Sequence, residues 1–328
     1  MKRTKLNLGL VMALSVIGTA FAANNTILKS GKIQTEISPD TGRIISFSKA
    51  GGQNLLWFAS QKQLSKCKQA GKWMNYGGDK IWPSQQVQWF FSNDNKGWPP
   101  DKKIDGSSWK FSRGKEDSII LQSPFTDKLN INVTRIITPL KKLPGILIKN
   151  EILRNENNSF PVHIWSVTQI KQPLFFLLNI AEKRPNMHRH FLKLSRPARS
   201  FSKDELELAS KNVLVFKNRK LGKGEKIGSF GNWLAAIYED TIFVQITNLR
   251  MNGCYPDGAN LEIFVNAPEI FGNYSEMEIL SPNVHLKKDE KISNKTLWLI
   301  LDKTPQDSYS KIISKIEKYL PDAMKLLE

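Results

Sequence analysis

The stretch LNINVTRIITPLKKLPGILIKNEIL, residues 129–153, decides the fold class of this chain. It holds two runs rich in Ile, Val, Leu and Thr, Leu129 to Ile137 and Gly145 to Leu153, with Pro and Lys residues between them. β-branched residues favour strands, whereas Pro and Gly mark turns. The stretch therefore predicts two consecutive β-strands.

The same pattern of short apolar runs, separated by Gly, Asn, Asp and Pro, extends from about residue 26 to 303. Further runs are Lys32 to Ile37, Arg43 to Ser48, Ser118 to Gln122, Val162 to Ile170, Trp233 to Tyr238, Thr241 to Asn248, Asn260 to Asn266, Tyr274 to Leu280, and Lys291 to Leu301. No helical pattern between them could connect parallel strands, so the sheets should be antiparallel. We expect one all-β domain, a large β-sandwich, over residues 23–303.

The end of the chain has a different period. Thr304 can cap a helix with Pro305 at its first position, and Pro321 should end it. The apolar residues that recur at helical spacing are Tyr309, Ile312, Ile313, Ile316, Tyr319 and Leu320. We expect an amphipathic helix within residues 304–328 that packs on the sandwich; the alternative is a helix for a membrane surface or a partner.

The first residues have the pattern of a signal peptide. Basic residues precede the apolar run Leu8 to Gly18, and Ala20-Phe21-Ala22 offers small residues at a cleavage site. We predict cleavage after Ala22 and a periplasmic or secreted protein. The apolar run is too short for a membrane span of about 20 residues, so we expect no transmembrane segment in the mature chain.

The 328-residue chain has a formal net charge of +18, which favours anionic partners or surfaces. Removal of three basic residues with residues 1–22 leaves +15. Cys67 and Cys254 are the only cysteines; the sequence does not decide whether they pair, and two free buried thiols are the simpler interpretation. Without Walker, Rossmann, HExxH or GxSxG motifs, we expect no cofactor and no metal.

A segment rich in tryptophan suggests a binding site. Five of the nine tryptophans lie between residues 73 and 109, among Gly and Pro residues that predict a long loop. Such a loop can exist to bury its own aromatic residues. The alternative is a sugar site, because a pyranose needs an aromatic platform with amides and carboxylates. Candidate ligand-binding residues here are Asn75, Asp79, Trp82, Trp98 and Asp101.

Several motifs resemble a bacterial family of the galactose mutarotase-like superfamily, over roughly residues 30 to 300. The most specific are Gly-Gly-Asp-Lys-Ile-Trp-Pro at 77–83 and Trp-Pro-Pro-Asp at 98–101, and Trp-Ser-Val-Thr-Gln at 165–169 and Tyr-Pro-Asp-Gly at 255–258 agree. The resemblance implies a twisted antiparallel β-supersandwich that binds sugar on a concave sheet. It adds Trp165, Gln169, Tyr255 and Asp257 to the candidate sugar-binding residues.

Mutarotases open the sugar ring with a Glu as base and a His as acid, and the resemblance implies aldose 1-epimerase-like isomerase chemistry here. Strand alternation places Tyr274, Glu276 and Glu278 on one face, where mutual repulsion would raise one carboxyl pKa. We assign Glu278 as the base, Glu276 as a residue that binds the sugar beside it, and His163 as the acid. A solvated strand face is the alternative, and the segment at 165–169 stands where mutarotases have a His-Pro-Tyr-Phe-like motif.

Between Lys183 and Lys203 there are many basic residues and no acidic one. The segment is either a solvated loop or an anion site in which Arg184 and Arg189 hold an acidic sugar. Few aromatics interleave with it, so we expect no nucleic-acid partner. The sequence thus favours an exported carbohydrate-binding protein that resembles aldose epimerases. The alternatives are a non-catalytic sugar binder and a basic envelope protein that binds anionic polymers.

Overall fold

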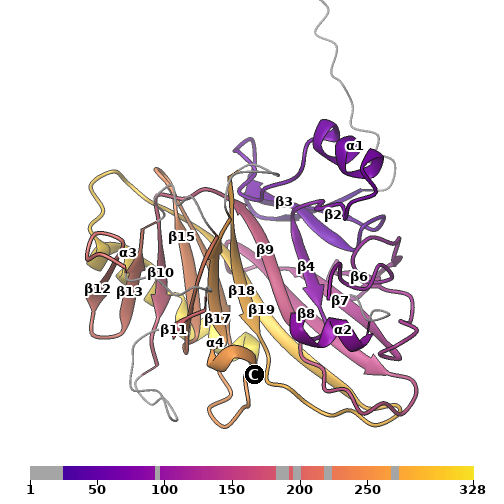
Figure 1. Cartoon of the computed structure of the whole chain (residues 1–328). Coiled ribbons are helices and arrows are strands. Elements are labelled where there is room, and N and C mark those ends of the chain that lie inside the picture. The colour runs from indigo at the N-terminus through magenta and orange to yellow at the C-terminus, as the bar shows by residue number, and fades with distance from the viewer. Residues whose placement is uncertain (1–24, 93–96, 182–191, 195–200, 218–223, 267–272) are drawn as a thin grey trace, which may run out of the picture.

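The structure is a computed structural model that describes residues 25–92, 97–181, 192–194, 201–217, 224–266 and 273–328. These residues form two large antiparallel sheets (Figure 1), which confirms the predicted all-β sandwich. The predicted leader, residues 1–22, lies outside the described residues.

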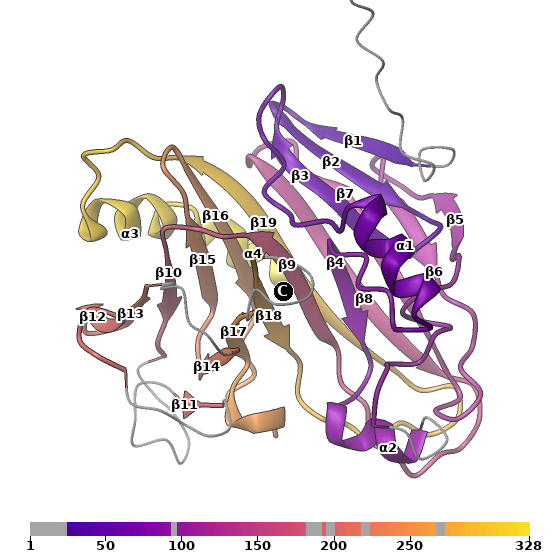
Figure 2. The same cartoon turned by 45° about the horizontal axis from the view of Figure 1, so that its top comes forward.

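Within the described residues the first sheet has nine strands, in the spatial order β1-β2-β3-β4-β9-β18-β17-β14-β11. Their bounds in that order are Thr26–Ser30, Ile33–Ser38, Arg43–Lys49, Asp79–Trp82, Trp165–Lys171, Tyr274–Leu280, Leu261–Val265, Glu225–Ser229 and Leu192–Lys193. Figure 2 shows β4, β9, β18 and β17 side by side at its centre. This central part of the sheet carries the candidate site.

The second sheet has ten strands among the described residues, in the order β12-β13-β10-β15-β16-β19-β8-β7-β6-β5. Their bounds are Leu206–Ser210, Val213–Phe216, Phe175–Asn179, Trp233–Ile237, Thr241–Thr247, Lys291–Asp302, Gly145–Arg154, Ile131–Pro139, Ile119–Gln122 and Lys110–Arg113. The two apolar runs at 129–137 and 145–153 form β7 and β8, which pair with each other in antiparallel register.

The main core lies between the two sheets. Phe47 of β3 packs against Phe243 of β16 and Trp298 of β19, with ring centroids 5.2 and 5.3 Å apart. Alternation supplies the rest, since every second residue of a strand turns toward the other sheet. Ile146, Ile148 and Ile152 of β8 do so and are almost fully buried.

Two helices cover the outer face of the ten-stranded sheet, α3 (Tyr309–Glu317) and α4 (Leu320–Leu327). Ile312, Ile316 and Leu327 pack there against outward residues of β15, β16 and β19. This confirms a C-terminal helix on the sandwich, but its predicted limits were wrong. Ser308, not Thr304, caps α3. Pro321 lies in the first turn of α4, where a missing N–H costs no helical hydrogen bond.

The sequence predicted one long loop for the tryptophan-rich segment, and this prediction was wrong. Asp79–Trp82 forms strand β4 inside the nine-stranded sheet, because it pairs along its whole length with β9. Around it lie α1 (Gln61–Gln69), a short 3₁₀ turn at Gln86–Gln88 and α2 (Trp89–Ser92). A second 3₁₀ turn covers Pro256–Gly258.

Both cysteines are free: Cys67 is buried on α1, whereas Cys254 is exposed, against the expectation that both are buried. None of the described helices is long and apolar enough to cross a membrane.

Candidate functional site

A cavity of about 840 Å³ lies on the face of the nine-stranded sheet that points away from the core. Strand alternation creates this face. On β18, Met277 and Ile279 join the core, whereas Tyr274, Glu276 and Glu278 line the cavity. The lining also includes Lys72, Trp73, Trp82, Gln86, Trp98, Trp165, Gln169, Lys226, Phe264 and Asn266.

Indole rings form one wall of the cavity. Trp82 of β4 meets Trp165 of β9 and Trp89 of α2 edge to face, at centroid distances of 5.0 and 5.1 Å. Trp73 and Trp98 meet in the same way at 4.8 Å. Edge-to-face contacts hold each ring by its neighbours. Trp98 is 42% exposed, so the outer end of this wall remains accessible to a ligand.

A half-buried cation, Lys226, joins two buried carboxylates at the other wall. Lys226 of β14 lies 2.8 Å from Glu278 and 2.6 Å from Glu262 of β17. Burial opposes its charge, but the two carboxylates outweigh burial and raise the pKa of Lys226. Burial raises the pKa of Glu262 to about 8, although Lys226 lowers it. The indole Nε1 of Trp165 donates a 2.6 Å hydrogen bond to Glu278 Oε2, which also accepts from Lys226.

Glu276 is held differently and keeps contact with the cavity. Gln169 of β9 donates a hydrogen bond to Glu276 Oε1 at 2.7 Å. The Glu276 side chain forms no ion pair within the described residues. Burial raises the pKa of Glu276 to about 7; Lys80 lowers it and Glu278 raises it further. Burial, rather than the repulsion predicted from the sequence, is therefore the main cause. A carboxyl group with this pKa can exchange protons near neutrality.

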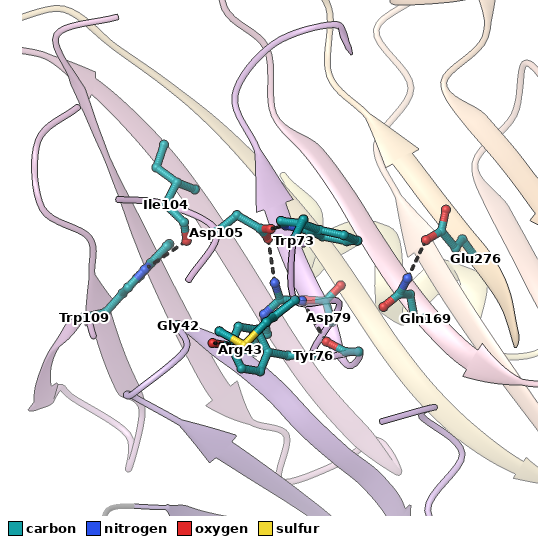
Figure 3. Close-up of polar contacts among 12 residues, drawn as sticks. Gly42, Arg43, Trp73, Tyr76, Asp79, Ile104, Asp105, Trp109, Gln169 and Glu276 are labelled. Atoms are coloured by element: carbon teal, nitrogen blue, oxygen red, sulfur yellow. Dashed lines mark hydrogen bonds and ion pairs between the residues drawn. The ribbon is translucent and has the colours of Figure 1, made fainter. Parts of the chain in front are cut away.

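A network behind the cavity fixes the Trp73 ring (Figure 3). Its Nε1 donates to Asp105 Oδ2 at 2.8 Å, and Arg43 Nη2 of β3 lies 2.6 Å from Asp105 Oδ1. Arg43 also donates to the Gly77 carbonyl at 2.8 Å and lies over the Tyr76 ring. The Arg43 and Asp105 side chains are each 1% exposed. Trp73 is thus anchored to the core of the nine-stranded sheet.

The structure brings six of the predicted site residues together in the cavity lining. They are Trp82, Trp98, Trp165, Gln169, Glu276 and Glu278.

Three other predicted residues, Asn75, Asp79 and Asp101, lie outside the lining. Asp79 points into the sandwich, where it forms an ion pair with Arg135 of β7 and accepts from Thr168 at 2.7 Å. Its neighbour Lys80 lies on the opposite face of β4, with its ammonium group over the Trp82 and Trp73 rings. Asn75 is buried and donates to the Tyr274 hydroxyl at 3.3 Å. Asp101 accepts from the Lys103 backbone at 2.8 Å, as a turn residue does.

Tyr255 and Asp257 also lie outside the lining, in and beside the second 3₁₀ turn. The Tyr255 hydroxyl accepts from the Arg250 backbone at 2.9 Å, and its ring packs against Phe230. Asp257 has a φ of 55°. Tyr255 also packs against the cluster that contains Trp82 and Trp165, so it supports the aromatic wall from outside the lining.

His163 does not line the cavity either. Its side chain is fully buried, and its Nδ1 lies 3.0 Å from Asn283 Oδ1. Burial lowers the pKa of His163 to about 4, so the ring is neutral at pH 7. Nothing in this position supports the predicted role as acid. Arg184 and Arg189 lie outside the described residues.

Lys226 and Lys80 escaped the sequence reasoning. Lys226 belongs to a strand that the apolar pattern did not reveal, and Lys80 stands in a segment interpreted as loop. The alternation of Lys80 with Trp82 was the available signal. No group of three His, Cys, Asp or Glu side chains that could hold a metal occurs in the described part of the chain.

The two sheets and their order define a galactose mutarotase-like fold, and comparisons with solved structures agree. A protein of Escherichia coli K12, described provisionally as an aldose 1-epimerase, matches with a TM-score of 0.57 and 11% identity over 85% of this chain and 99% of its own. A galactose mutarotase-like protein of Lactobacillus casei matches with a TM-score of 0.56 and 10% identity over 85% of this chain and 100% of its own.

A galactose mutarotase related enzyme of Lactobacillus acidophilus matches with a TM-score of 0.55 and 11% identity, covering 87% of this chain and 99% of its own. At these identities the likeness concerns the fold. The chain belongs to the family described as Domain of unknown function (DUF4380), whose model matches residues 24–301. No curated protein matches the sequence.

Proposed function

We propose that this protein binds a carbohydrate in the cavity on the nine-stranded sheet. The supporting observation is that Trp73, Trp82, Trp98 and Trp165 line one cavity together with amide and carboxylate groups. Indole faces suit the C–H patches of a pyranose, and the polar groups suit its hydroxyls. The mutarotase-like names of the structural neighbours point in the same direction.

A second function, interconversion of sugar anomers, is favoured by one observation. Glu276 combines a place in the cavity lining with a pKa raised by burial to about 7. A base of this strength can take the proton of the anomeric hydroxyl and so start ring opening. Glu278 suits this role less, because Trp165 and Lys226 both donate to its Oε2. We therefore assign the base to Glu276 and ligand binding to Glu278.

Calorimetric titration with a panel of neutral and acidic mono- and disaccharides tests the binding function. Trp98→Ala should weaken binding about 2- to 10-fold, the worth of one aromatic contact. Phe111→Ala on β5 is a matched control, since Phe111 is 41% exposed, Trp98 is 42% exposed, and Phe111 does not line the cavity. The proposal is wrong if no sugar in the panel binds, or if both variants weaken binding equally.

Salt separates this function from the alternative of a basic protein that adheres to anionic polymers. Attraction between exposed charges is screened over about 8 Å at physiological ionic strength. Sugar stacking should therefore survive 0.5 M NaCl, whereas adhesion through the net charge, +18 for the full chain and +15 without residues 1–22, should not. Binding of polyanions that persists without any sugar affinity would favour the alternative.

We also propose that the protein is exported and that its leader is removed after Ala22. The support is the basic start, the apolar run and the Ala-Phe-Ala ending described above. Expression of the full chain in a bacterial host, followed by fractionation and intact mass measurement, tests this. A chain beginning at Ala23 in the periplasm or medium is expected; an intact chain in the cytosol contradicts the proposal.

A further inference from the structure

Lys80 lies under the aromatic wall of the cavity. It shares the outward face of β4 with Trp82, while Ile81 between them belongs to the core. Its Nζ lies 4.7 Å from the centre of the Trp82 ring and 5.7 Å from that of Trp73. Both rings line the cavity. The Lys80 side chain is only 2% exposed and does not itself line the cavity, so the ammonium group lies behind the two rings.

The Lys80 ammonium group makes no hydrogen bond with any described residue. Buried polar groups in folded proteins almost always have such a partner, and the cation–π contacts replace only part of it. The group is therefore held with its protons uncommitted, next to a cavity that we assign to an oxygen-rich ligand. Burial lowers the pKa of Lys80 to about 8.

The charges around Lys80 come from three parts of the structure. Arg43 of β3 acts with burial to lower its pKa, whereas Glu276 and Glu278 of β18 and Asp105 behind Trp73 raise it. Asp105 already pairs with Arg43, and Glu278 already pairs with Lys226. Glu276 is thus the carboxylate that remains to act together with Lys80.

Lys80 and Glu276 lie on the same face of the sheet, on the two strands that flank β9. Strand β9 separates β4 from β18; Lys80 pairs with Val167, and Glu276 pairs with Gln169. Two inter-strand spacings place the backbones of β4 and β18 about 10 Å apart. A sugar ring above β9 would then have the ammonium group on one side and the carboxylate on the other.

We propose that Lys80 is the proton donor in the opening of an aldose ring and that Glu276 is the acceptor. This inference rests on the proposed function. Glu276 takes the anomeric hydroxyl proton, the C1–O bond to the ring oxygen breaks, and C1 becomes an aldehyde. Lys80 gives its proton to the ring oxygen through a bridging water, because its side chain does not line the cavity. After rotation about C1–C2 the reverse steps close the ring and restore both groups, so the reaction has no net proton transfer.

The matched pKa values support this pairing. A carboxylate acceptor needs a pH above about 7, and an ammonium donor needs a pH below about 8. The rate should therefore have a narrow maximum between these two pH values. Like Lys80, His163 is buried and does not line the cavity, but its pKa is lowered to about 4, so it holds no proton to donate near pH 7.

The experiment follows freshly dissolved aldose anomers by proton NMR, with calorimetric affinity measured beside it. Lys80→Met should slow catalysed equilibration by about 10²- to 10⁴-fold, the range for general acid catalysis. Its sugar affinity should stay within about threefold of wild type, since the ammonium group acts on bond cleavage rather than on ligand stacking. Lys171→Met, at the end of β9 and outside the cavity lining, is the control for loss of one positive charge and should keep full activity.

Lys80→Arg distinguishes proton donation from mere charge. Arginine keeps the positive charge and the cation–π contacts but does not release its proton, so this variant should be as slow as Lys80→Met. Full activity of Lys80→Arg or Lys80→Met would overturn the proposal. The pH profile of wild type requires no variant to fold: a rate that stays flat from pH 8 to pH 10 would also overturn it.

The outcome for wild type separates the two proposals. A protein that binds sugars but does not accelerate their equilibration contradicts the role of Lys80 and leaves the binding function intact. A protein that binds no sugar contradicts both.

Discussion

The buried pair Arg43 and Asp105 predicts a large and specific loss of stability. Both side chains are 1% exposed, and Asp105 joins Arg43 to the Trp73 indole through 2.6 and 2.8 Å contacts. Asp105→Ala leaves the guanidinium buried with the Gly77 carbonyl and the Tyr76 ring as its remaining partners in this network. Breaking such a pair on one side costs about 3–5 kcal/mol. We expect Asp105→Ala to lower the free energy of unfolding by that amount.

Urea denaturation followed by far-UV circular dichroism measures this change. Asp127→Ala is the matched control, because Asp127 is 77% exposed and pairs with Lys103 at 2.5 Å. An exposed pair is worth about 0–1 kcal/mol, so the control should lose no more than this. Adding Arg43→Met to Asp105→Ala should recover part of the loss, since the double variant leaves no unpaired buried charge. A loss below about 1 kcal/mol for Asp105→Ala would refute the reasoning.

Three further predictions concern the same part of the molecule. Glu276→Gln should become more stable relative to wild type as pH rises from about 4 to above 7, by up to about 3 kcal/mol. The carboxyl pKa is about 7 in the folded protein and 4.5 in an unfolded chain, so wild type loses stability as the pH rises between these two values. Urea titrations at several pH values measure this loss. Lys226→Met leaves Glu262 and Glu278 without their shared cation and should lower the free energy of unfolding by about 3–5 kcal/mol. The loss should be larger at pH 9 than at pH 6, because Glu262 has a pKa of about 8. Equal losses at both pH values would contradict this. Gly42→Ala should lower the thermal midpoint of unfolding, because Gly42 has a φ of +64° and a Cβ there would lie 2.4 Å from the Trp109 ring. Gly51→Ala is the control: Gly51 also has a positive φ but lies in open space, so its thermal midpoint should fall less.

The fold class could be predicted from the sequence because the residue pattern of a strand is local. Apolar runs such as those at 129–137 and 145–153 hold their pattern whatever lies across the sheet, and Gly and Pro mark their ends. The helix limits were less predictable. Thr304 and Ser308 can both cap a helix, and the choice depended on how Ile312 and Ile316 reach the outer face of β16 and β19.

The composition of the site was visible in the sequence, but its arrangement was not. Alternation along one strand was enough to place Glu276 and Glu278 on one face and to relate Trp165 to Gln169. Pairing between strands remote in sequence decided the rest. It turned Asp79 toward Arg135 and Lys80 toward the Trp82 ring, buried His163 beside Asn283, and brought Lys226 to Glu278. Burial, which lowers the pKa of Lys80 and of His163, exists only after such pairing, so the tertiary structure alone decided which of these two side chains can donate a proton near neutrality.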